Sequence, residues 1–129
     1  MPIASPDATV KNERSGRLET GRSPIRANPA PEALPSGAIL VAAGDLLRAL
    51  AAPVRIAIVL QLKESARCVH QLVEELEVAQ PLISQHLRIL KAAGVVYGER
   101  RGREVVYRLV DEHLTHIVVD AVTHAGEHA

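Results

Sequence analysis

Side chains that bind metal ions gather near the end of this 129-residue chain. Four of the six histidines lie at positions 113, 116, 124 and 128, and they are accompanied by Asp111, Glu112, Asp120 and Glu127. On a helix, His113, His116, Asp120, His124 and Glu127 follow one another at spacings of 3, 4, 4 and 3, which places all five on one face. Imidazole and carboxylate groups are ligands of zinc. The pattern favours a metal site over a merely solvated helix face.

One copy of this helix cannot hold the whole set around one ion. His113 and His124 are eleven residues apart, or about 16 Å along the helix axis. If two copies lie antiparallel across a two-fold axis, Asp111 and His113 of one copy meet His124 and Glu127 of the other. This arrangement predicts two equivalent four-ligand sites. Three nearby residues stay open as alternative ligands: Glu112, His116 and His128.

A second set of side chains is suited to reading DNA. A short helix over 69–76 and a turn at 78–80 precede another helix, which Pro81 opens and Gly94 follows. This succession is typical of a helix-turn-helix, whose second helix enters the major groove. Arg88 is the preferred base reader, because arginine can pair with guanine. The glutamines of the same helix can pair with adenine. The DNA-facing residues predicted on this helix are Gln80, Ser84, Gln85, His86, Arg88 and Lys91.

An arginine-rich hairpin follows the helix-turn-helix directly. The β-prone runs 95–97 and 104–107 flank a polar tip over 98–103, which carries Arg100, Arg101 and Arg103. These arginines suit phosphate or minor-groove contacts. Between Gln80 and Arg108 six basic residues stand against two acidic ones, although the formal net charge of the chain is zero. Either feature alone is equally compatible with simple packing, but the two in succession favour DNA binding.

The remaining elements are helices that support these two sets. Ser36 is suited to cap a helix running to Leu50, Pro53 to open a second over 53–62, and Asp111 to cap the last one. We therefore expect a mainly α domain with a small β-hairpin, a winged helix-turn-helix over 37–129, acting as a dimer. Residues 1–36 hold six of the eight prolines and no apolar periodicity, which predicts a disordered tail.

Composition excludes several classes of protein. The chain has room for one domain, and its lack of Trp and Phe leaves a small core that dimerisation would assist. A single cysteine excludes an intrachain disulfide framework. No apolar stretch approaches the roughly 20 residues of a membrane span, and residues 1–10 do not look like a secretory signal. We expect a cytoplasmic protein with no membrane partner.

Several segments resemble the ArsR/SmtB family of bacterial metalloregulators. They are CVHQL at 68–72 and QPLISQHLRILKAAGVV at 80–96, with LAAPVR at 50–55 upstream and RGREVVY at 101–107 downstream. The resemblance extends over roughly residues 38–128. It implies a repressor that binds operator DNA as a dimer built from its first and last helices, and that leaves the operator when metal binds.

The same resemblance bears on the ligands. The SmtB-like branch has an interhelix site made of an Asp-x-His pair and a later His-x-x-Glu pair, which Asp111, His113, His124 and Glu127 match. The family's thiolate site near Cys68 is poorly matched. His70 stands where a second cysteine often sits, and residues 1–36 contain neither Cys nor His. We therefore interpret Cys68 as a structural residue, and His86 as a DNA contact or a packing residue.

The resulting hypothesis is a repressor whose apo homodimer binds double-stranded operator DNA, near the nucleoid, and is released by Zn²⁺. Nitrogen and oxygen donors also allow Co²⁺ or Ni²⁺, whereas soft ions prefer thiolates. One alternative keeps the DNA binding but assigns a non-metal effector. Another, from a different class, is a metal-dependent enzyme, for which the sequence supplies no nucleophile or paired-carboxylate machinery. We do not expect catalysis.

Overall fold

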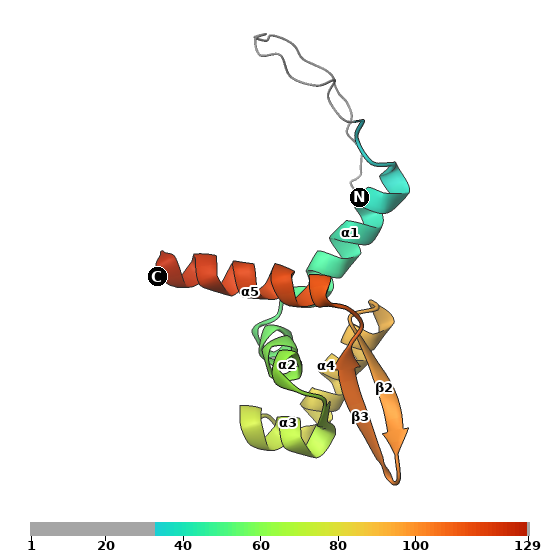
Figure 1. Ribbon diagram of the computed structural model, residues 1–129, viewed down its shortest axis with the longest axis vertical. Helices are drawn as coiled ribbons and strands as arrows, with labels where there is room; N and C mark the ends of the chain where they lie inside the picture. Colours follow the sequence, from blue (N-terminus) through green and yellow to red (C-terminus); the bar gives the residue numbers. More distant parts are fainter. Residues whose placement is uncertain (1–32, 129) are drawn as a thin grey trace. The chain divides into compact units, whose positions relative to one another are not determined.

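The structure is a computed structural model that describes residues 33–128. Within these residues five helices and three strands follow one another along the chain (Figure 1). Their bounds are α1 Gly37–Leu50, α2 Pro53–Glu64, β1 Arg67–Cys68, α3 Val69–Leu76, α4 Gln80–Ala92, β2 Val96–Arg101, β3 Glu104–Leu109 and α5 Glu112–Glu127. The predicted tail over 1–36 lies almost wholly outside the described residues.

Local signals start the helices where the sequence predicted them. The Ser36 side chain accepts a hydrogen bond from Ile39 N at 3.2 Å, and Pro53 stands in the first turn of α2. The Asp111 side chain likewise caps α5 by accepting from His113 N at 2.9 Å. Gly94, just after α4, has the positive φ of 78° that glycine adopts without strain. These helix predictions are confirmed.

The core lies between α2, α3, α4 and the sheet, with the first half of α5 against it. Its fully buried side chains come from α2, α3, α4, β2 and the turn just before β2: Ile58, Val59, Leu72, Ile83, Leu87, Leu90, Val95 and Val96. Burying one such aliphatic side chain stabilises the fold by about 1.5–3 kcal/mol. Because three of them come from α4, that helix is held firmly with its opposite face outward.

The sheet differs from the predicted two-stranded hairpin in two ways. A third strand, β1, pairs with β3, so the strand order is β1-β3-β2. In addition, residues 98–101 belong to β2 and not to the tip, because their backbone pairs with β3 as far as Arg101 opposite Glu104. A two-residue strand shows no periodicity, and the polar stretch GERR resembles a loop until its partners across the ladder are known.

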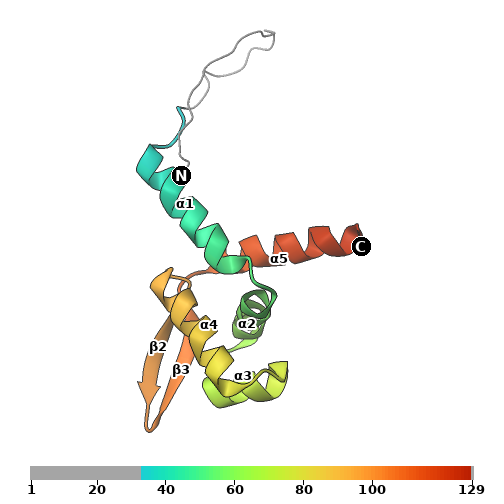
Figure 2. The same ribbon diagram turned by 180° about the vertical axis from the view of Figure 1, so that it is seen from behind.

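Within residues 33–128, helices α1 and α5 each expose apolar side chains. On α1, Ile39, Leu40, Val41 and Leu47 are exposed, and on α5 Ile117 and Val122 are exposed. The second half of α5 extends away from the rest of the domain, as the two opposite views show (Figures 1 and 2). Accordingly, every residue from Ala121 to His128 is exposed.

Residues 33–128 contain no single helix long and apolar enough to cross a membrane. Only α1 and α2 taken together reach that length and apolarity, and the two are bent by 90° at the break between them.

Candidate nucleic-acid interface and metal-ligand cluster

The α3–turn–α4 unit exposes one polar face. The turn begins at Glu77, whose left-handed backbone (φ 55°, ψ 42°) ends α3. Helix α4 then buries Ile83, Leu87 and Leu90. The opposite side carries the predicted DNA-facing set: Gln80, Gln85, Arg88 and Lys91 are exposed and Ser84 is half-buried. Arg88 follows Ser84 by four residues and precedes Lys91 by three, so these three share one face.

His86 is the member of the predicted set that points elsewhere. Its Nδ1 lies 3.2 Å from a terminal guanidinium nitrogen of Arg55 on α2. Since arginine is always a donor, this nitrogen of His86 accepts the hydrogen bond. Arg55 also donates from Nε to the carbonyl oxygen of Ala49, near the end of α1, at 2.6 Å. Of the two roles left open for His86, these contacts support packing.

Arg55 therefore ties three helices together, and the sequence analysis missed it. Its side chain is half-buried, and it reaches from α2 to the last turn of α1 and to the middle of α4. An arginine in the first turn of a helix, two residues after Pro53, carries no sequence signal of such a role. The 31-residue separation from His86 shows why, because only the folded chain brings the two together.

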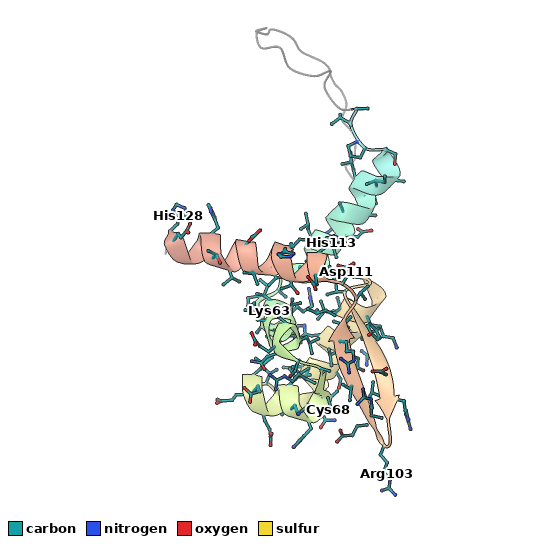
Figure 3. All side chains as sticks on the ribbon, in the orientation of Figure 1. Lys63, Cys68, Arg103, Asp111, His113 and His128 are labelled. Carbon is teal, nitrogen blue, oxygen red and sulfur yellow. The ribbon has the colours of Figure 1, made fainter. Side chains whose placement is uncertain are left out.

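The hairpin of β2 and β3, which we call the wing, has at its tip a tight two-residue turn at Gly102 and Arg103. Gly102 has φ 63° whereas Arg103 shows no positive φ, as in the type II′ turn that suits a two-residue hairpin. Arg103 therefore projects from the tip, farthest from the core (Figure 3). Its exposed position suits contact with a phosphate.

Arg100 and Arg101 lie on opposite faces of the wing. Side chains of neighbouring strand residues alternate between the faces of a sheet. On one of the two faces Arg101 lies 3.7 Å from Glu99, which also accepts a hydrogen bond from Arg108 Nε at 3.1 Å. Arg100 shares the other face with Val105, and among residues 33–128 it has no ion pair. Arg100 and Arg103 are thus the wing cations left available to a ligand within the described chain.

A hollow joins the start of α4 to the wing. It has a volume of about 310 Å³ and is lined by Cys68, Val69, His70, Gln80, Arg103, Glu104, Val105 and Tyr107. Gln80 and Arg103 therefore border the same surface, although Gln80 comes from α4 and Arg103 from the tip of the wing. Both views place α3 and the hairpin tip at the same end of the domain, remote from the end of α5 (Figures 1 and 2).

The first pair of predicted metal ligands meets at the start of α5. One oxygen of Asp111 lies 3.5 Å from His113 Nδ1 and also accepts the capping hydrogen bond from His113 N. Tetrahedral zinc, with bonds near 2.0–2.2 Å, sets neighbouring ligand atoms about 3.4 Å apart. The observed separation fits two adjacent ligands of such an ion.

The second pair meets at the other end of α5, together with one of the alternative ligands. Ligand atoms of His124, Glu127 and His128 all lie within 4.8 Å of one another. The rings of the two histidines have centroids 4.6 Å apart. All three side chains are exposed, so they can adjust around an ion. Figure 3 shows Asp111 and His113 at one end of the helix and His128 at the other.

A single chain does not bring the two ligand pairs together. The helix between His113 and His124 keeps them about 16 Å apart along its axis. His116 and Glu112 belong to neither cluster of close ligand atoms within the described residues. The donor set of imidazoles and carboxylates fits Zn²⁺, Co²⁺ or Ni²⁺.

Cys68 is buried beside the hollow described above, with a relative exposure of 7%. Its backbone N donates to the side chain of Gln71 at 2.9 Å, which fixes the start of α3. Its backbone also belongs to β1, opposite Val106. These contacts are those of a structural residue at a strand–helix junction.

Comparison with known proteins identifies the family. A family model described as the bacterial regulatory protein, arsR family, matches residues 52–97. The HTH-type transcriptional repressor SmtB of Mycobacterium tuberculosis is 74% identical over 101 residues, which cover 78% of this chain and 73% of the relative. The chain belongs to the ArsR family of bacterial regulatory proteins. A second relative, the HTH-type transcriptional regulator NmtR of the same organism, is 39% identical over 79 residues, covering 61% of this chain and 66% of NmtR.

Solved structures of other proteins share the fold. The solution structure of apo-NmtR matches with a TM-score of 0.60 at 32% identity, covering 82% of this chain and 88% of that one. A homodimeric winged helix-turn-helix DNA-binding domain from Mycobacterium bovis, described as a possible ArsR-family transcriptional regulator, matches with a TM-score of 0.67 at 25% identity, covering 78% and 93%. The described domain is thus a winged helix-turn-helix, as predicted.

Proposed function

We propose that this protein is a transcriptional repressor whose metal-free homodimer binds operator DNA. The dimer leaves the DNA when a transition-metal ion binds between the α5 helices, and Zn²⁺ is the ion we propose first. The observation that carries the proposal is the division of the ligands into two pairs at opposite ends of α5. The ligand atoms of each pair lie close together within one chain, but two ligands are too few to complete a zinc site. The close similarity to a transcriptional repressor supports the DNA-binding half of the proposal.

The DNA contact is assigned to α4 and the wing. Arg88 with Gln85 would read base edges in the major groove, while Lys91 and Gln80 contact phosphates. Arg100 and Arg103 extend the contact from the wing. In a dimer the two α4 helices would enter successive major grooves of a palindromic operator, about 34–36 Å apart. Such binding places the protein in the cytoplasm with the nucleoid.

The dimer is supported by the apolar surface that the single chain leaves uncovered. A hollow of about 200 Å³ between α1, α2 and α5 is lined by Leu47, Leu50, Ala51, Ile56, Ile117, Val118 and Ala121. Leu47 lines this hollow and also belongs to the exposed apolar face of α1. We therefore propose that the hollow and this face are buried together against a second copy of the chain. The matching domain from M. bovis is itself homodimeric.

One antiparallel register of two α5 helices satisfies both ligand pairings. The midpoint between His113 and His124 and the midpoint between Asp111 and Glu127 both fall at Val118–Val119. With the two-fold axis at that point, each end of the helix pair collects four ligands from two chains. A bound ion supplies a cross-link between the two chains at each of these ends.

The wing is placed to respond to such a link. Strand β3 ends at Leu109, and Val110 N donates to Val95 O at 3.0 Å. Asp111, the next residue, caps α5 and is at the same time a proposed ligand. A shift of Asp111 is therefore passed directly to β3 and the wing. The coupling between the two sites is reciprocal. If metal binding lowers the affinity for DNA by a given factor, DNA binding lowers the affinity for metal by the same factor.

The deciding experiment measures operator affinity by fluorescence anisotropy with and without Zn²⁺, using duplex DNA from the protein's own upstream region. The wild type should bind more weakly when zinc is present, and His113→Ala should bind equally in both conditions. Coupling between sites is typically worth about 5–150-fold.

His70→Ala is the matched control, because it removes an exposed histidine on α3 that pairs with Glu74 and lies in neither ligand cluster. It should retain the zinc response. If the wild type binds the operator equally with and without zinc, the metal-sensing half of the proposal is wrong. A different effector would then act on the same winged-helix repressor.

A further inference from the structure

The C-terminal end of α5 holds one more ligand than a four-ligand interhelix site requires. His124, Glu127 and His128 stand at positions i, i+3 and i+4, so their side chains are neighbours on the helix surface. His128 is the C-terminal cap residue of the helix, and its ring centroid lies 4.6 Å from that of His124, with the two ring planes tilted by 53°. The chain itself therefore groups three ligand atoms.

The chemistry of this triad differs from that of a closed zinc site. Two histidines and one carboxylate gathered on one side of an ion leave the opposite coordination positions open. Structural zinc sites are closed by four ligands in a tetrahedron. Adding the partner's Asp111 and His113 to three ligands brings the total to five, which exceeds that number.

We propose that His128 is a metal ligand in addition to His124 and Glu127, so that each chain captures an ion with its own three side chains before the partner completes a site with more than four ligands. The completion by Asp111 and His113 of the second chain rests on the function proposed above, whereas capture by the triad does not. A site of this kind favours Co²⁺ or Ni²⁺ relative to Zn²⁺ more than a tetrahedral site does.

The exposure of the triad supports the capture step. Every residue from Ala121 to His128 is exposed in the single chain, so hydrated ions reach all three side chains. The Asp111–His113 pair offers two ligand side chains where the triad offers three, and one of the two Asp111 oxygens also accepts the capping hydrogen bond of α5. The C-terminal end is therefore the stronger of the two half-sites.

The test is a Co²⁺ titration of the full-length apo protein followed by visible absorption, which distinguishes tetrahedral Co²⁺ from the weakly absorbing five- and six-coordinate ion. The wild type should show the weak bands of the higher coordination number. His128→Ala should shift to the stronger tetrahedral bands and bind Co²⁺ at least about tenfold more weakly, since even outer-shell partners are worth about 10–100-fold. His70→Ala, which removes a histidine far from α5, should match the wild type.

A third variant separates this inference from the proposed function. His113→Ala should still bind Co²⁺ through the triad, with a spectrum that differs from that of the wild type. Identical spectra and affinities for the wild type and His128→Ala would overturn the inference, as would complete loss of binding in His113→Ala. If His128 governs the spectrum but zinc leaves operator binding unchanged, the inference stands and the proposed function fails.

Discussion

Asp111 has two roles in the proposed mechanism, and a pair of substitutions separates them. Its side chain caps α5 by accepting from His113 N at 2.9 Å, and it is also a proposed metal ligand, 3.5 Å from His113 Nδ1. Asparagine caps a helix about as well as aspartate does, whereas alanine does not cap at all. Asp111→Asn should therefore keep the cap and lose the ligand, and Asp111→Ala should lose both.

The sizes of the two effects follow from this geometry. Loss of the capping bond costs about 1 kcal/mol. For a domain of this size that corresponds to a fall of about 4–8 °C in Tm. Asp111→Asn gives up only the attraction between a negative charge and the helix N-terminus, about 0.5 kcal/mol for a half-exposed carboxylate. Both variants should bind Zn²⁺ at least about tenfold more weakly.

The assay compares thermal unfolding of the apo proteins at one fixed protein concentration, because the stability of a dimer depends on concentration. Zinc affinity is measured by competition with a chelating dye. Glu112→Gln is the matched control, since it removes a charge from the same helix turn without touching the cap. Equal destabilisation of Asp111→Asn and Asp111→Ala would refute the capping argument. Wild-type zinc affinity in Asp111→Asn would refute the ligand assignment.

Three further predictions concern the DNA face and its support. Arg88→Ala should cost about 1–3 kcal/mol on the operator and relax specificity, while Arg103→Ala should weaken all duplexes alike and reduce the salt slope by about one. Anisotropy at several salt concentrations checks this, and an equal loss for Arg88→Ala on scrambled DNA would contradict it. Arg55→Ala should lower the free energy of unfolding by about 2 kcal/mol, because the Ala49 carbonyl and His86 both lose a charged donor. Urea unfolding measures this, and a loss below about 0.5 kcal/mol would show that those bonds contribute little. Gly98→Ala should destabilise the wing by about 1 kcal/mol, since the added Cβ would stand 2.8 Å from a methyl carbon of a stiff β-branched side chain in the facing strand; unchanged urea unfolding would show that the strand moves aside.

The sequence predictions agree with the structure where they depend on residues close together in the chain, and differ from it where they depend on distant partners. The face of α4 followed from helical spacing within thirteen residues, and there only His86 departs from the outward set. The hairpin was predicted at the right place in the chain, but its tip was predicted to span 98–103, whereas the structure limits it to residues 102 and 103. Gly98 and Glu99 are strand residues because Tyr107 and Val106 lie opposite them. Nothing within the segment 98–101 itself indicates that pairing.

For the proposed metal ligands, too, part of the arrangement follows from local spacing and part depends on the structure. The stripe on α5 could be predicted from spacing alone, and the close approach of Asp111 to His113 and of Glu127 to His124 follows from their separations of two and three residues. The choice of His128 over His116 as the third member of a cluster depended on the positions of the side chains at the end of the helix.

By itself the sequence determined the helices, their caps and their polar faces, because capping bonds and 3.6-residue periodicity act within one or two turns. The order of helix-turn-helix and arginine-rich hairpin belongs to the same local information. Only the tertiary structure decided that β1 joins the sheet through Val106, that Arg55 holds His86 against α2, and that the free end of α5 stands clear of the core. Those features depend on where distant segments come to rest when the core packs, and local spacing does not specify that.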